Sequence, residues 1–181
     1  MLLIIDRDGT LLASDDFPGK EHDWKGTIKI NKPVAQFVSH LKNVFNVTSI
    51  VVSNQAGVAR GYFDLDRVKA INSKLNQELM KSGIKIDSWQ FCPDVDGAYL
   101  KKNPEVKILE NYIKEKTKRK PSPKMVFDGL LELKKNIKDF DTILVLGNQK
   151  DDADLAKNLN ARFINVVGKT LKELIDILAV I

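Results

Sequence analysis

The stretch "LLIIDRDGTLL", residues 2–12, places two carboxylates directly after an apolar run. The run 2–5 has the length of a short buried strand. Asp6 and Asp8 follow it, one residue apart, and Gly-Thr comes next. Carboxylates are costly to bury unless they are paired, hydrogen-bonded or bound to a metal. The stretch therefore predicts a strand that carries a polar site at its carboxyl end.

Strand-like and helix-like segments alternate along the rest of the chain. Apolar, β-branched runs predict strands at 47–53, 88–92, 141–147 and 162–167. Amphipathic patterns predict helices at 32–43, 64–83, 105–118, 123–136 and 152–160, and a last helix after Thr170. This alternation predicts an α/β fold, a three-layer Rossmann-like doubly wound parallel sheet covered on both faces.

The loops that follow the strands are expected to carry the chemistry, because ligands bind beyond the carboxyl ends of such strands. The irregular segment 13–30 comes directly after the aspartate pair, so it could lean over the site. No linker, repeat or low-complexity tract divides the chain. We expect one domain over residues 1–181.

Composition narrows the class of protein. The chain has 181 residues, 43% hydrophobic and 29% charged, as in an ordinary globular domain. A single cysteine, Cys92, excludes an internal disulfide and a four-cysteine zinc site, and fits a reducing cytosol. The sequence shows neither a signal peptide nor an apolar run of membrane-spanning length. We expect a cytoplasmic protein without a membrane partner.

The positive charge is concentrated in one segment. Residues 101–139 hold twelve basic and six acidic residues, whereas the whole chain has a net charge of +5. One interpretation is a solvated, lysine-rich helix. The other is a positive rim that attracts a phosphate-bearing substrate.

Two of the loops contain side chains that could react with or bind a phosphoryl group. In "DRDGT" (6–10), one carboxylate can attack an electrophile while the other moves protons. In "SNQAGVARGYF" (53–63), the Ser53 hydroxyl and the Asn54 amide can bind phosphate oxygens. Gly57 lets backbone N–H groups approach an anion.

Two further loops offer a cation and an acidic wall. In "KRKPSPK" (118–124), Lys120 precedes a proline that favours an extended backbone, and it can neutralise a carboxylate and a phosphoryl group together. In "GNQKDDADLA" (147–156), Asp151 and Asp152 can face a cation or stabilise the start of the next helix.

Taken in order, "DRDGT", "SNQAGVARGYF", "RKPSPKM" and "GNQKDDADLA" resemble the four motifs of the haloacid dehalogenase-like phosphatase superfamily, over nearly the whole chain. The likeness is greatest to subfamily IIIA, the branch of the histidinol-phosphate, heptose-bisphosphate and polynucleotide 3'-phosphatases. It implies Mg²⁺ as cofactor, with Asp6 as nucleophile and Asp8 as general acid/base. The resemblance implies that the catalytic residues are Asp6, Asp8, Ser53 and Lys120. It implies that the substrate contacts are Asn54, Arg60 and Arg119. It implies that the metal ligands are Asp6, Asp8, Asn148 and Asp152.

The sequence departs from the family pattern in two places. Asn148 stands at the first acidic position of the fourth motif, and its amide can ligate Mg²⁺ without a charge, so weaker binding is expected. Cys92 alone remains in the region where relatives often carry a cysteine-rich zinc loop, so no structural zinc is expected. Short gaps between the motifs predict a minimal cap or none, and an open site.

These features predict a Mg²⁺-dependent phosphomonoester hydrolase that works through an aspartyl-phosphate. The expected substrate is a small phosphorylated metabolite such as a sugar phosphate. One alternative is a nucleic-acid 3'-phosphatase, and phosphoryl transfer to another acceptor is a further enzymatic outcome. A catalytically weak phosphate-binding domain is the non-enzymatic alternative, suggested by Asn148. The sequence indicates no oligomeric state.

Overall fold

The computed structural model describes residues 1–14 and 17–180, and five strands in that part of the chain form a parallel sheet. The strand order is β3-β2-β1-β4-β5, so the strand that precedes the aspartate pair lies at the centre. Leu2 pairs with Thr48 on one side and with Ile143 on the other. The strands are β1 (Leu2–Ile5), β2 (Thr48–Asn54), β3 (Ser88–Cys92), β4 (Ile143–Gly147) and β5 (Arg162–Asn165).

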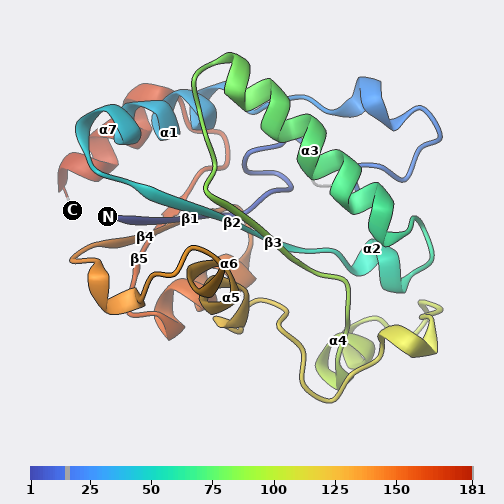
Figure 1. Cartoon of the computed structure of the whole chain (residues 1–181). Helices are drawn as coiled ribbons and strands as arrows, with labels where there is room; N and C mark the ends of the chain where they lie inside the picture. Colours follow the sequence, from blue (N-terminus) through green and yellow to red (C-terminus); the bar gives the residue numbers. More distant parts are fainter. Residues whose placement is uncertain (15–16, 181) are drawn as a thin grey trace.

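Helices cover both faces of the sheet (Figure 1). Helices α1 (Lys32–Val44), α3 (Leu65–Lys81) and α7 (Leu171–Val180) lie on one face, and α5 (Lys124–Glu132) and α6 (Lys150–Asn158) lie on the other. Successive side chains of a strand point to opposite faces. Leu3 and Ile5 accordingly belong to the apolar core on the face covered by α1, α3 and α7, and Leu2 and Ile4 belong to the core on the face covered by α5 and α6. The predicted three-layer parallel α/β fold is confirmed.

The helix ends follow local sequence signals in most cases. Asp64 accepts a hydrogen bond from the Arg67 N–H at 2.7 Å, and Gly83 ends α3 with a φ of 72°. Thr170 and Glu173 form a capping box at the start of α7, where the last helix was predicted. Asn31 precedes α1 and is of a residue type that commonly caps helices, but it makes no side-chain cap hydrogen bond.

The prediction of a helix over 105–118 is wrong. That segment contains only a 3₁₀ turn, Glu110–Tyr112. Its backbone groups bond to other segments: the Leu109 N–H donates to the Ala59 carbonyl at 2.8 Å, and Val95 exchanges hydrogen bonds with the carbonyl of Tyr112 and the N–H of Lys114, each at 2.9 Å. These tertiary partners replace the bonds that a helix would make, so the apolar periodicity of the segment did not decide its structure.

Two short helices were not predicted, and both lie towards the carboxyl end of the sheet. They are α2 (Ala56–Ala59) and α4 (Gly97–Lys102) (Figure 1). Ala56 and Ala59 pack with Val95 and Tyr99 in a small apolar cluster of their own. This cluster fixes the region between β3 and α5 against α2, directly beside the predicted site.

No helix within residues 1–14 and 17–180 combines the length and apolar character required to cross a membrane.

Candidate active site

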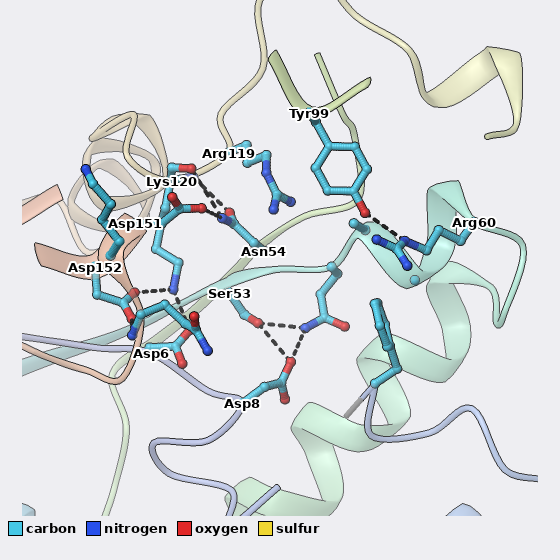
Figure 2. Close-up of a pocket in the computed structure, with 16 residues that line it drawn as sticks. Asp6, Asp8, Ser53, Asn54, Arg60, Tyr99, Arg119, Lys120, Asp151 and Asp152 are labelled. Carbon is cyan, nitrogen blue, oxygen red and sulfur yellow. Dashed lines mark hydrogen bonds and ion pairs between the residues drawn. The ribbon is translucent and has the colours of Figure 1, made fainter. Parts of the chain in front are cut away.

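A buried charge cluster lies at the carboxyl ends of β1 and β4. Asp6 directly follows β1, is 6% exposed, and its N–H donates to the Leu146 carbonyl at 2.9 Å. The Lys120 ammonium donates to the Asp6 carboxylate, and to Asp152 Oδ1 at 2.6 Å (Figure 2). A buried lysine therefore lies between two buried aspartates that come from opposite ends of the sequence.

Asp152 is held in place from two directions. While Oδ1 accepts from Lys120, Oδ2 accepts from the N–H groups of Asn148 at 3.1 Å and Gln149 at 3.0 Å, at the start of α6. Any side chain at Gly147 would place its Cβ 2.4 Å from Asp152. Glycine at the end of β4 thus allows the aspartate to reach the lysine.

Burial controls the ionisation of this cluster. Burial raises the pKa of Asp6 to about 7; Lys120 opposes the shift, and the Asp152 and Asp8 carboxylates reinforce it. For Lys120, burial alone would lower the pKa, but the two aspartates outweigh burial and raise it. Lys120 therefore remains a fixed positive charge beside the predicted nucleophile.

Asp8 opens onto the same pocket as Asp6 and is oriented by neighbours. The buried Arg7 donates to its carboxylate from Nε at 2.7 Å and Nη2 at 3.0 Å, and anchors itself to Asn72 Oδ1 at 2.8 Å. Gln55 Nε2 donates to Asp8 Oδ2 at 2.6 Å and to Ser53 Oγ at 2.7 Å. The Asp8 carboxyl is thereby fixed between Arg7 and Gln55.

Asn54 holds the backbone of Lys120. Its Oδ1 accepts from the Lys120 N–H at 2.8 Å, and its Nδ2 donates to the Lys120 carbonyl at 3.2 Å and to Asp151 Oδ2 at 3.4 Å. This pair of backbone bonds fixes the point from which the lysine side chain extends.

The predicted catalytic residues and substrate contacts line one cavity of about 340 Å³. Figure 2 shows Asp6, Asp8 and Ser53 on one side of it and Tyr99, Arg60 and Arg119 on the other. Lining residues that the motifs did not indicate include Phe17, Gln55 and Tyr99. Gln55 lies inside a quoted motif and could have been found. Tyr99 lies outside the four quoted motifs, and its place at the cavity depends on α4, which was not predicted.

Asn148 lies beside the cavity, where oxygen atoms converge. Its amide lies 3.2 Å from Asp6 Oδ2 and from the Asp8 carbonyl oxygen, and in the orientation that satisfies both acceptors its nitrogen donates to them. In the part of the chain that the structure describes, His, Cys, Asp and Glu form no group of three or more that could hold a metal. A carboxylate, a main-chain carbonyl and an amide oxygen are nevertheless the hard donors that Mg²⁺ prefers, so this set fits the ion.

Comparison with known proteins agrees with the fold. No family model matches the chain. The chain is 30% identical over 155 residues to a D-glycero-β-D-manno-heptose-1,7-bisphosphate 7-phosphatase from Rhodopseudomonas palustris, covering 84% of this chain and 76% of the relative. It is 29% identical over 161 residues to a heptose-bisphosphate phosphatase of Thermosynechococcus vestitus, covering 86% and 73%.

Among solved structures, the D,D-heptose 1,7-bisphosphate phosphatase of B. bronchiseptica has the same fold. The TM-score is 0.69 at 20% identity, and the alignment covers 99% of each chain. Sequence and fold together place the protein: it belongs to the haloacid dehalogenase-like superfamily of phosphatases, in the branch of the heptose-bisphosphate phosphatases.

Proposed function

We propose that this phosphatase hydrolyses a small phosphorylated sugar through an aspartyl-phosphate on Asp6. The observation that carries the proposal is the convergence of Asp6, Asp8, Ser53 and Lys120 on one cavity at the carboxyl ends of the strands. A nucleophile, a second carboxyl and a fixed cation within one site are what phosphoryl transfer to and from an aspartate requires.

The residues divide the reaction into two steps. An Asp6 carboxylate oxygen attacks phosphorus, the bond from phosphorus to the alcohol oxygen breaks, and Asp8 gives its proton to that oxygen. Asp8 then takes a proton from water, the water oxygen attacks phosphorus, and the Asp6–phosphorus bond breaks to release phosphate. Ser53 donates to a phosphoryl oxygen, and Lys120 neutralises the charge that develops on the transferring group.

Mg²⁺ fits the oxygen set beside the nucleophile. Asp6, the Asp8 carbonyl and the Asn148 amide oxygen would hold it, and the ion would supply positive charge to the phosphoryl oxygens. In this proposal Asp152 does not ligate the metal, because its two oxygens already accept from Lys120 and two backbone N–H groups. The B. bronchiseptica structure contains magnesium and phosphate, which supports a magnesium site in this fold without identifying its ligands here.

The substrate class is inferred from the relatives and from the far side of the cavity. The matched relatives act on heptose 1,7-bisphosphate by name. Arg119 lines the cavity, and its Nη1 is buried without an acceptor among the described residues. It can therefore donate to an oxygen of the substrate, and the cavity volume suits a small metabolite.

Phosphate release tests the proposal. We expect the purified chain with Mg²⁺ to hydrolyse D-glycero-β-D-manno-heptose 1,7-bisphosphate or another sugar phosphate faster than amino-alcohol phosphates, nucleotides or 3'-phosphorylated oligonucleotides. Release of phosphate from none of these would contradict the proposed function.

Asn148→Asp should lower the Mg²⁺ concentration needed for half-maximal rate. A carboxylate adds a charge where the Asn148 amide lies 3.2 Å from Asp6 Oδ2 and the Asp8 carbonyl oxygen, and so strengthens the electrostatic attraction for the cation. The Mg²⁺ dependence of the initial rate measures the effect, and Asn46→Asp, exposed just before β2, is the control. An unchanged or weaker dependence would place Asn148 outside the metal site.

A nucleic-acid 3'-phosphatase is the second candidate, favoured by the basic segment 101–139. Lys101 and Lys102 are exposed at the end of α4, and Lys102 lines a smaller cavity that adjoins the site. A polynucleotide substrate would give a rate that falls steeply with salt, because each neutralised phosphate releases counterions. We expect instead that a 3'-phosphorylated oligonucleotide is not hydrolysed at low salt, and that alanine at both lysines leaves the sugar-phosphate rate unchanged. Salt-sensitive hydrolysis that depends on the two lysines would favour this second candidate.

A further inference from the structure

The outer side of the cavity is an aromatic wall made by three separate segments. Phe17 lies in the loop after β1, Tyr62 lies in the loop after α2, and Tyr99 lies in α4. The Phe17 and Tyr62 rings meet edge to face, with centroids 5.1 Å apart. Phe17 and Tyr99 line the cavity directly.

Arg60 is the residue that joins these segments. Its Nε donates to the Tyr99 hydroxyl at 2.7 Å (Figure 2). Its Nη2 donates to Asn103 Oδ1 at 3.2 Å. The guanidinium carbon lies 4.9 Å from the centre of the Phe17 ring and 5.9 Å from that of Tyr62. Arg60 therefore contacts all three parts of the wall at once, in the geometry of cation–π and hydrogen-bonding pairs.

The wall is held tightly against the site. The backbone of Phe17 has a φ of 42°, a conformation that a non-glycine residue keeps only where its surroundings hold it. A Cβ on Gly57 would lie 2.4 Å from Phe63 and 3.1 Å from Phe17, so the rings pack directly onto α2. On the side away from Arg60, the Arg119 guanidinium lies 4.7 Å from the centre of the Tyr99 ring.

We propose that Arg60 is a positioning residue that fixes Phe17 and Tyr99 and so determines which leaving group the phosphatase accepts. Although Arg60 also lines the cavity, its Nε and Nη2 are directed at Tyr99 and Asn103 and its face is against Phe17, so we expect it to act through the wall and not through a charge on the substrate. This inference rests on the proposed reaction at Asp6. In the proposed reaction the phosphoryl group lies near Ser53 and Lys120, across the cavity from Arg60, so we expect the wall to contact only the rest of the substrate.

Two conservative variants separate positioning from direct binding. Arg60→Lys keeps the positive charge but loses the planar fork of donors. Tyr99→Phe keeps the ring but loses the hydroxyl that accepts from Arg60. We expect each to raise KM for D-glycero-β-D-manno-heptose 1,7-bisphosphate by about tenfold, because small displacements of positioning groups cost this much or more. Inhibition by orthophosphate, which needs no leaving group, should stay within about twofold of wild type, since it reports only the phosphoryl end of the site.

A double-mutant cycle completes the test. If Arg60 acts through Tyr99, combining the two changes should raise KM little more than either alone, because the residues share one contact. Arg162→Met, on the exposed start of β5, is the control for loss of an arginine. A wild-type KM in Arg60→Lys, or effects that multiply in the double variant, would overturn the proposal. Absence of phosphate release from the wild type would instead contradict the proposed function itself.

Discussion

Asp6→Asn is expected to abolish turnover while the protein stays folded. If an Asp6 carboxylate oxygen is the nucleophile that bonds to phosphorus, the asparagine amide of the variant cannot replace it. The rate should then fall by about 10³-fold or more. Stability should not fall with it. Burial raises the pKa of Asp6 to about 7, which means that the ionised carboxylate is costly where it lies. A neutral amide of nearly the same shape removes this cost, and Lys120 retains Asp152 as its partner.

The experiment compares initial rates of phosphate release and urea unfolding midpoints for the wild type and Asp6→Asn. Asp154→Asn on α6 is the matched control, because its carboxylate pairs with Lys150 and Lys157 and does not line the cavity. A rate within about tenfold of wild type would remove Asp6 from the role of nucleophile, since loss of a covalent nucleophile costs far more. A lowered midpoint would mean that the Asp6 charge stabilises the fold, contrary to the burial argument.

The sequence was sufficient to predict the site residues that lie next to a recognisable strand. Asp6 and Asp8 could be placed at the end of a strand because an apolar run precedes them directly, and the alternation of strands and helices then predicts where the other strand ends meet. The chain does place Ser53 and Asp152 at that edge of the sheet. The ion pairs of Lys120 could not be derived from its own neighbours, because its partners lie 114 and 32 residues away along the chain.

The aromatic wall lay outside what the sequence could predict. Its formation depends on α2 and α4, which are too short to show a hydrophobic periodicity in the sequence. It also depends on the segment 105–118, which was wrongly predicted to be a helix. In 105–118, Ile108 and Tyr112 recur at helical spacing, yet both pack against the small cluster beside α2. From its motif, Arg60 was predicted to contact the substrate. The structure shows that its aromatic and hydrogen-bonding partners come from three separate segments. Such pairings over long separations leave no local pattern.

Lys120→Met is expected to have the largest effect on stability. The lysine side chain is 4% exposed, and it is paired with Asp6 and with Asp152, which is 1% exposed. Methionine fills a similar volume but leaves two carboxylates buried without their cation. Removing one partner of a buried ion pair costs about 3–5 kcal/mol. The free energy of unfolding, measured with urea in EDTA so that no divalent cation replaces the lysine, should fall by about this amount, and phosphate release should be lost. Lys124→Met, exposed at the start of α5, should change neither.

A second substitution separates charge from packing. Lys120→Met combined with Asp152→Asn removes one of the two uncompensated carboxylates, and Asn can still accept the backbone N–H groups of Asn148 and Gln149 through its oxygen. If the buried charge causes the loss, the double variant should be more stable than Lys120→Met alone by about 1–2 kcal/mol, because one desolvated ion has gone. It should remain inactive, since the cation beside the nucleophile is still absent. A double variant no more stable than Lys120→Met would show that the lysine stabilises the fold through its packed alkyl chain, and Lys120 would then keep only its catalytic role in this proposal.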